Sequence, residues 1–228
     1  MIVAEQKNIK EIIEILGDDF NNLLIVGCGT CVTVSLAGGE REVKTLASIL
    51  RTYYSNKDKD VTINTTTIKR QCDFEFIDDI EEMIKENGII LSLACGIGVQ
   101  HIVERHPKKI VYPGLNTSFY GATTAVGQWD ERCIGCGDCI LDDYFGICPI
   151  ARCSKQLLNG PCGGSQNGEC EVDPEIDCAW ELIYNRADKL GKVEELLGYK
   201  EPKDWEVYRD GGPRTLINEE YHEDRKET

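Results

Sequence analysis

The chain has 228 residues, of which 41% are hydrophobic, and its formal net charge is −15. The length suits one large domain or two small ones, and the apolar fraction is sufficient for a packed core. The acidic balance argues against a nucleic-acid-binding protein, because neutralising phosphates takes a surplus of Lys and Arg.

The sequence shows neither a secretory signal peptide nor a membrane span. The first residues do not combine a basic region with a short apolar run. No stretch reaches the roughly eighteen consecutive apolar residues that a spanning helix needs. We therefore expect a cytoplasmic protein that does not bind a membrane.

Residues 1 to about 125 alternate between helix and strand patterns. Apolar residues at helical spacing predict a helix from Ile9 to Leu16, with Gly17 as its stop. Further patterns predict, in chain order, a buried strand over 22–26, a helix around 43–50, a strand over 61–68, one helix through 77–84 that stops at 87–88, a strand over 89–94, a helix around 99–103 and a strand over 110–112. This alternation predicts an α/β domain over 1–125 with a Rossmann-like, parallel sheet.

Residues 126–200 form a different segment, in which Gly, Asp, Pro and Cys interrupt any periodicity. Because this segment holds little apolar material, we expect a small cysteine-rich domain that bound metal stabilises. A polar, extended C-terminal tail follows over 201–228 and is expected to lie over the surface or a partner. Before it, one helix places four apolar residues on one face: Trp180, Ile183, Ala187 and Leu190.

The twelve cysteines are the most informative residues of the chain. In a secreted protein they would predict disulfides, but the sequence shows no export signal. In a reducing compartment, clustered cysteines more often bind metal or do redox work. Iron–sulfur and zinc sites are therefore the leading hypotheses, and disulfides rank third.

Four cysteines follow three of the predicted strands. Cys28 and Cys31 come after the first, Cys72 after the second and Cys95 after the third. Loops at the carboxyl ends of parallel strands converge on one crevice, so these thiols can meet. Glycines flank them and allow backbone N–H groups near the sulfurs, as a cuboidal iron–sulfur cluster requires. We predict a shared metal site here, with a cluster favoured over zinc.

Two simpler interpretations compete with a metal site at this first group. Gly27 and Gly29 could begin a dinucleotide-binding fingerprint, but Val32 occupies the position of its last glycine. Buried, inert cysteines are also common, and Cys72 or Cys95 alone would suggest no more than that.

The remaining cysteines begin with a C-x2-C-x2-C loop. Such a loop presents three sulfurs to one cluster while the fourth ligand comes from elsewhere. Bacterial ferredoxins place Cys-Pro three residues later, whereas here eight residues intervene, so the match is partial. The pool of eight suffices for two four-cysteine sites: Cys133, Cys136, Cys139, Cys148, Cys153, Cys162, Cys170 and Cys178.

Zinc is the serious alternative for the second group, because structural zinc also takes four thiolates. The spacing suits zinc ribbons poorly, and one cluster plus one zinc ion is a further option. The pairing of cysteines with sites does not follow from the sequence. His101 and His106 are interpreted as ordinary helix residues and His222 as part of the tail, so no catalytic acid or base is predicted.

The stretch from Cys133 to Gly164, which ends in an NGPCGG box, resembles the C-terminal domain of methylenetetrahydrofolate reductase. VGCGTC, the RQC at 70–72 and LACGIGVQ resemble the N-terminal part of the small subunits of this enzyme in acetogens and related anaerobes. The resemblance covers residues 1 to about 220. Relatives often have a third cysteine after the first strand, where this chain has Ser35.

The resemblance implies an iron–sulfur electron-transfer subunit with two or three [4Fe-4S] clusters, or with zinc in place of one. Its implied partner is a flavin-containing, MetF-type subunit that reduces 5,10-methylenetetrahydrofolate to 5-methyltetrahydrofolate, with an upstream electron-donor subunit as a further partner. The chain is too short to include the flavin-bearing barrel of the MetF-type subunit, so we expect no flavin or folate to bind this chain alone.

Two other functions compete with electron transfer. A zinc-binding scaffold subunit of the same complex would have no redox role. An oxidoreductase with its own nicotinamide or flavin site in residues 1–125 is a third hypothesis, and the incomplete glycine fingerprint counts against it.

Overall fold

The computed structural model describes residues 1–218 and 220, and it divides into two compact units, Met1–Glu131 and Arg132–Thr228. We call them the first and the second unit. His222, which the sequence analysis assigned to the tail, lies outside the described residues together with the rest of 221–228. The predicted boundary near residue 125 falls inside the last strands of the first unit.

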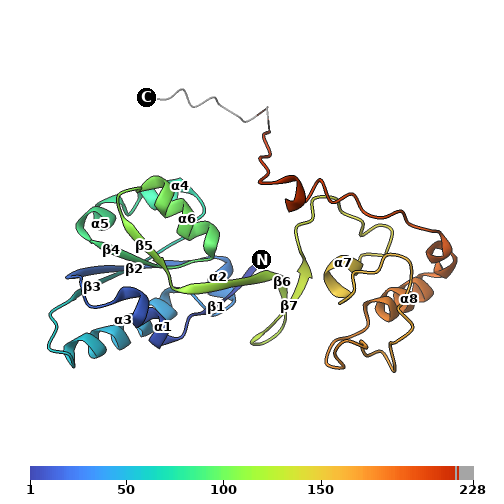
Figure 1. Cartoon of the computed structure of the whole chain (residues 1–228), viewed down its shortest axis with the longest axis horizontal. Coiled ribbons are helices and arrows are strands. Elements are labelled where there is room, and N and C mark those ends of the chain that lie inside the picture. The colour runs from blue at the N-terminus through green and yellow to red at the C-terminus, as the bar shows by residue number, and fades with distance from the viewer. Residues whose placement is uncertain (219, 221–228) are drawn as a thin grey trace. The chain divides into compact units, whose positions relative to one another are not determined.

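The first unit contains a parallel four-stranded sheet with the strand order β3-β2-β4-β5 (Figure 1). The strands are β2 (Asn22–Cys28), β3 (Thr62–Ile68), β4 (Ile89–Leu93) and β5 (Ile110–Pro113). All residues of β4 are buried, as are residues 23–28 of β2. Continuously buried, largely apolar strands of this kind are typical of parallel sheets that are covered on both faces.

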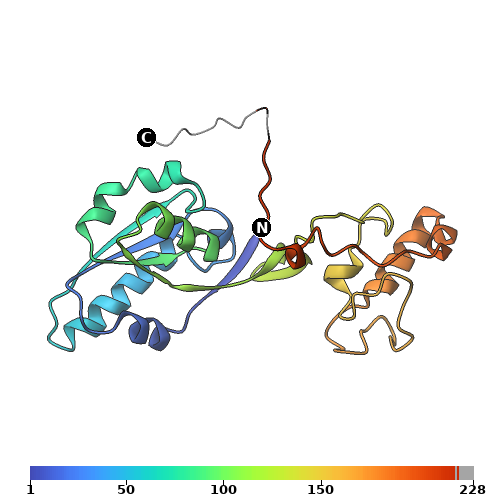
Figure 2. The same ribbon diagram turned by 45° about the horizontal axis from the view of Figure 1, so that its top comes forward.

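Helices cover both faces of this sheet. The elements α1 (Ile9–Leu16) and α3 (Glu40–Ser55) lie on one side, and α4 (Phe74–Asp78), α5 (Glu81–Glu86) and α6 (Gly96–Arg105) on the other (Figures 1 and 2). Because strand side chains alternate, Leu23 and Ile25 pack in the α1/α3 core, and Leu24 and Val26 in the α4–α6 core.

The helix predicted through 77–84 is two helices, α4 and α5, with a break at Asp79 and Ile80. The three isoleucines that suggested one helix are buried together in the α4–α6 core. The apolar spacing therefore reports the buried face correctly, although a bend in the chain interrupts the helix. Gly17 ends α1 as predicted, with φ 63°.

A second, antiparallel sheet in the first unit has no counterpart in the predicted elements. It has the order β1-β6-β7 and consists of β1 (Ile2–Gln6), β6 (Leu115–Ala125) and β7 (Gln128–Cys133). Ile2 pairs with Tyr120, and Gln6 pairs with Leu115. Most of β6 is exposed and polar, so it lacks the apolar alternation that reveals a half-buried strand.

The second unit has short helices and an apolar core of its own. Its elements are α7 (Pro149–Arg152), α8 (Ala179–Leu190) and the 3-10 turns η1 (Val193–Leu197) and η2 (Arg209–Gly211). Tyr144, Trp180 and Ile183 form the buried centre. This core is small, in keeping with the little apolar material expected of this segment.

Two hydrogen bonds fix the aromatic residues of this small core. Tyr144 Oη donates to the carbonyl of Leu158 (3.0 Å), and Trp180 Nε1 donates to that of Leu157 (2.9 Å). Of the four apolar residues predicted on one face of α8, only Leu190 is exposed. It is the last helical residue, and Gly191 follows in the left-handed conformation that commonly ends helices.

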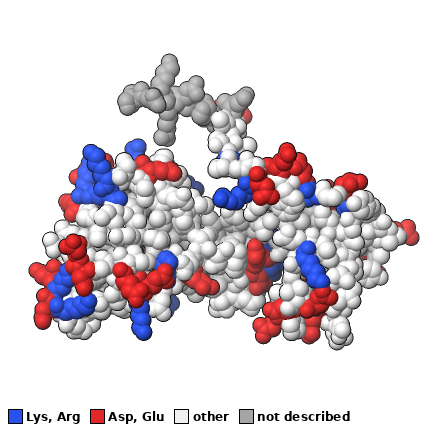
Figure 3. Space-filling view, in the orientation of Figure 1, with Lys and Arg blue, Asp and Glu red and all other residues white. Residues whose placement is uncertain are grey.

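On the face that Figure 3 shows, acidic and basic groups are interspersed in several small clusters, and no one large charged patch stands out. Across the described residues, no helix is both long and apolar enough to cross a membrane.

Candidate metal centres

The first four cysteines lie at the carboxyl ends of β2, β3 and β4. Cys28 ends β2, and Cys31 begins the short helix α2 (Cys31–Val34). Cys72 lies in the loop between β3 and α4, and Cys95 caps the N-terminus of α6. All four residues therefore lie where the carboxyl ends of these parallel strands lead into loops or helices, on the same side of the sheet.

Three of these thiols are close enough to influence one another. Partial desolvation raises the pKa of the Cys72 thiol, and the neighbouring Cys28 and Cys95 thiols raise this pKa further. The residue as a whole is exposed, so the protein desolvates only one side of it. Cys28 is buried, and Cys31 and Cys95 are half-buried. The site is thus open to solvent at Cys72.

A buried glutamine fixes the loop that carries Cys72. Gln71 Nε2 donates to the carbonyl of Val26 on β2 (2.9 Å), and Gln71 Oε1 accepts from Ser92 Oγ on β4 (2.6 Å). Sequence reasoning missed both side chains. The only signal was a polar residue directly beside a candidate ligand, and burial cannot be deduced from that.

Other contacts hold the backbone around Cys28 and Cys95. Thr33 Oγ1 donates to the carbonyl of Cys28 (2.7 Å), and Gly96 N donates to Thr117 Oγ1 (2.8 Å). Ser35 is buried, and its hydroxyl donates to the carbonyl of Val32 (3.4 Å). The Ser35 hydroxyl is therefore engaged within the loop backbone.

The glycines of the VGCGTC loop allow close packing of the backbone. A Cβ on Gly27 would lie 2.6 Å from Thr67 Oγ1 and 3.0 Å from the carbonyl oxygen of Gly38. Contacts inside the protein thus account for Gly27 without a nucleotide, which weakens the dinucleotide hypothesis further.

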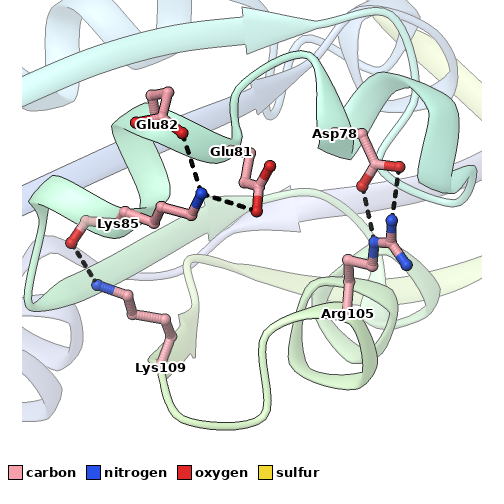
Figure 4. A network of polar contacts seen from close by, with 6 residues as sticks. All are labelled: Asp78, Glu81, Glu82, Lys85, Arg105 and Lys109. Carbon is pink, nitrogen blue, oxygen red and sulfur yellow. Dashed lines mark hydrogen bonds and ion pairs between the residues drawn. The ribbon is translucent and has the colours of Figure 1, made fainter.

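An ion pair joins the helices that follow Cys72 and Cys95 (Figure 4). Arg105 of α6 donates from Nε and Nη2 to the two carboxylate oxygens of Asp78 in α4, at 2.7 and 2.9 Å. Lys109 Nζ donates to the carbonyls of Lys85 and Asn87, which ties the end of α5 to the loop before β5. The helices that follow Cys72 and Cys95 are thus joined at their C-terminal ends.

In the second unit, the C-x2-C-x2-C loop is curled by Gly135 and Gly137, which have φ of 67° and 90°. Gly135 N donates to Cys133 Sγ (3.3 Å), and Cys136 Sγ donates to the carbonyl of Asp138 (3.4 Å). Backbone N–H groups directed at cysteine sulfurs are typical of loops that hold iron–sulfur clusters.

A different set of four cysteines lines one small pocket of about 20 Å³. This volume corresponds to about one water-sized sphere. A hydrogen bond with Ser154 Oγ (3.5 Å) and backbone N–H groups lower the pKa of the Cys170 thiol. Arg152 and Lys155 also line the pocket. The four cysteines are Cys153, Cys162, Cys170 and Cys178.

The donor chemistry of these groups fits a thiophilic metal. Thiolates suit zinc and iron–sulfur clusters, and backbone N–H groups donate to two of the sulfurs, Cys133 Sγ (from Gly135 N) and Cys162 Sγ (from Gly164 N, 3.4 Å). Among residues 1–218 and 220, however, no three His, Cys, Asp or Glu side chains are already arranged to hold a metal ion.

Comparison with known proteins gives one match. Residues 112–206 match the model of a family described as "Methylene-tetrahydrofolate reductase C terminal". The matched segment includes β6 and β7 of the antiparallel sheet and ends at residue 206, within the second unit. The matched segment is less than half of the chain and contains the cysteines from Cys133 to Cys178, but none of the first four. No curated protein and no solved structure matches the chain significantly.

Proposed function

We propose that the chain is the small, MetV-type subunit of an anaerobic methylenetetrahydrofolate reductase and relays electrons to a flavin-containing, MetF-type subunit. The observation that carries this proposal is the family match over 112–206, which contains eight of the twelve cysteines. In the overall reaction, 5,10-methylenetetrahydrofolate accepts two electrons and two protons, its bond from the methylene carbon to N10 breaks, and 5-methyltetrahydrofolate forms.

In this proposal each cysteine group has its own metal. Cys28, Cys31, Cys72 and Cys95 would hold one [4Fe-4S] cluster. The C-x2-C-x2-C loop with Cys148 would hold another, and the pocket lined by Cys153, Cys162, Cys170 and Cys178 would hold zinc, because its volume suits a single ion. Bound clusters supply one-electron redox chemistry, whereas zinc supplies only structure. The protein contributes thiolates, N–H donors and partial exclusion of water.

Metal analysis tests this function. The chain is purified without oxygen, and iron, acid-labile sulfide and zinc are measured per protein. We expect iron and sulfide for two clusters and about one zinc. The partner subunit is then assayed with the chain in its iron-loaded and iron-free forms. An iron-free chain that supports full partner activity would refute the relay.

A zinc-binding scaffold is the second candidate, and the small four-cysteine pocket is the observation that favours it. In that case all three groups bind zinc, and the protein is colourless because the filled d shell of Zn²⁺ gives no visible absorption. Broad visible absorbance that bleaches on reduction distinguishes the relay from the scaffold.

A further inference from the structure

Residues 200–214, which we call the C-terminal strap, lie against the cysteine-rich part of the second unit. The strap is attached first at Lys200, whose backbone exchanges two hydrogen bonds with the side chain of Asn159, at 2.7 and 2.8 Å. Asn159 is the first residue of the NGPCGG box. Lys200 Nζ also forms an ion pair with Asp143.

The second attachment is Lys203, a lysine whose side chain is only 2% exposed. Its Nζ donates to the carbonyl of Asp138 (2.6 Å) and to the Asp138 carboxylate (3.0 Å). A buried ammonium group is costly unless it is paired and hydrogen-bonded. Asp138 lies between Cys136 and Cys139, so this cation is held directly on the C-x2-C-x2-C loop.

The third attachment is Arg214. Its Nη2 donates to the carbonyl of Gly135 (3.1 Å), and its Nη1 donates to the carbonyl of Val207 within the strap (2.7 Å). A Cβ on Gly137 would lie 2.6 Å from Arg214 Nη1 and from the Val207 oxygen. The strap therefore packs against the loop so closely that only glycine fits at position 137.

These two cations bind carbonyls whose residues also contact the cysteine sulfurs. The Gly135 N–H donates to Cys133 Sγ, so Arg214 holds this residue from the opposite side. The Asp138 carbonyl accepts from both Cys136 Sγ and Lys203 Nζ.

We propose that Lys203 and Arg214 are positioning residues for the metal group of this loop and that their charges raise its reduction potential. The inference rests on the proposed relay function. Reduction adds an electron to a site that already carries several thiolate charges. Fixed cations beside the loop therefore stabilise the reduced form, in a chain whose net charge is otherwise −15.

The test uses the full chain, purified without oxygen. Lys203→Met and Arg214→Gln remove one charge each, Lys203→Arg keeps it, and Lys192→Met removes a surface lysine that pairs with Glu195. Clusters are titrated with dithionite as the one-electron reductant and followed by electron paramagnetic resonance. We expect each charge-removing variant to lower the reduction equilibrium constant of one cluster on the order of tenfold, or 59 mV. Lys203→Arg and Lys192→Met should leave it near the wild-type value.

A second measurement separates this inference from the proposed function. Metal release to a chelator and alkylation of freed thiols are followed in the same variants, whichever metal the chain contains. We expect Lys203→Met to release metal several-fold faster than Lys192→Met. A zinc-only protein would end the relay proposal, and equal release rates would then overturn the positioning role. Normal iron content with unchanged potentials would overturn the charge effect while leaving the relay intact.

Discussion

Ser92 Oγ donates a hydrogen bond of 2.6 Å to Gln71 Oε1, and both side chains are fully buried. The same glutamine donates to the carbonyl of Val26. Because Gln71 directly precedes Cys72, these two bonds attach the Cys72 loop to both central strands, β2 and β4. A buried amide that satisfies partners on two strands gives the loop one defined position.

Gln71→Leu should destabilise the first unit and lower its metal content. The substitution removes the side-chain donor to the Val26 carbonyl and the acceptor of the Ser92 hydroxyl, and an unsatisfied buried polar group costs about 1–3 kcal/mol. Hydrogen exchange of the β2 and β4 amides measures the free energy of opening. Gln100→Leu, on the exposed face of α6, is the control and should change this free energy by less than about 0.5 kcal/mol. Equal effects of the two substitutions would contradict the role assigned to Gln71.

Cys95→Ala should remove the metal of the first group alone. Cys95 lies at the N-terminus of α6, in a different unit from the eight later cysteines. We expect iron to fall by one cluster, while hydrogen exchange in α8 stays unchanged. A variant with full iron content would show that Cys95 is not a ligand.

Cys136→Ala should unfold the second unit around the C-x2-C-x2-C loop, because metal binding supplies much of the stability of such segments. Limited proteolysis of the full chain gives the readout, with cleavage expected between 133 and 178 and a protected first unit. Cys95→Ala serves as the reciprocal control. Unchanged iron and protease resistance would exclude Cys136 as a ligand.

Cys162→Ser should reduce zinc and spare iron. Cys162 lines the small pocket together with three other cysteines and lies apart in sequence from the triple-cysteine loop. Zinc and iron are measured on the same oxygen-free sample. Loss of iron instead of zinc would reverse the assignment of metals to the two groups of the second unit.

Tyr54 should make the first unit sensitive to alkali. Burial, followed by the nearby Asp18 carboxylate, raises the pKa of Tyr54 to about 12, and its hydroxyl donates to the carbonyl of Gly17 (2.8 Å). The unfolded chain ionises this phenol near pH 10. Stabilisation by the protonated phenol is therefore complete below about pH 10 and is lost as the pH rises through about 12.

Urea unfolding across this pH window checks the effect of Tyr54. Tyr54→Phe should flatten the fall in stability, whereas Tyr120→Phe, at an exposed position of β6, should not. A steep alkaline loss that persists in Tyr54→Phe would assign the effect to another group.

The sequence predicts the parallel sheet well because its strands are short apolar runs between helical patterns. Leu24 and Ile90 are fully buried at the positions that these runs indicate. The sequence does not predict β1 and β6, which pair with each other although most of the first unit's sequence lies between them. Thr117 and its neighbours in β6 are polar and exposed, so no periodic signal reports their pairing.

The sequence allows the grouping of cysteines to be predicted for the first candidate site but not for the second unit. The convergence of Cys28, Cys72 and Cys95 follows from strand order alone. The grouping of Cys153 with Cys178 does not follow from the sequence. Irregular loops and isolated β-bridges bring these residues together, and such segments have no repeating sequence pattern. The burial of Lys203 could not be predicted from the sequence either, since a lysine in a polar tail is normally solvated.

The pairing of β1 with β6 sets an order for folding during translation. Ile2 leaves the ribosome long before Tyr120, its neighbour in the antiparallel sheet, so the first strand stays without its partner until most of the first unit has been synthesised. The edge that carries Cys28, Cys72 and Cys95 is then complete before Cys136 emerges. If the chain holds the metals proposed above, the first unit can receive its metal before the cysteines of the second unit have left the ribosome.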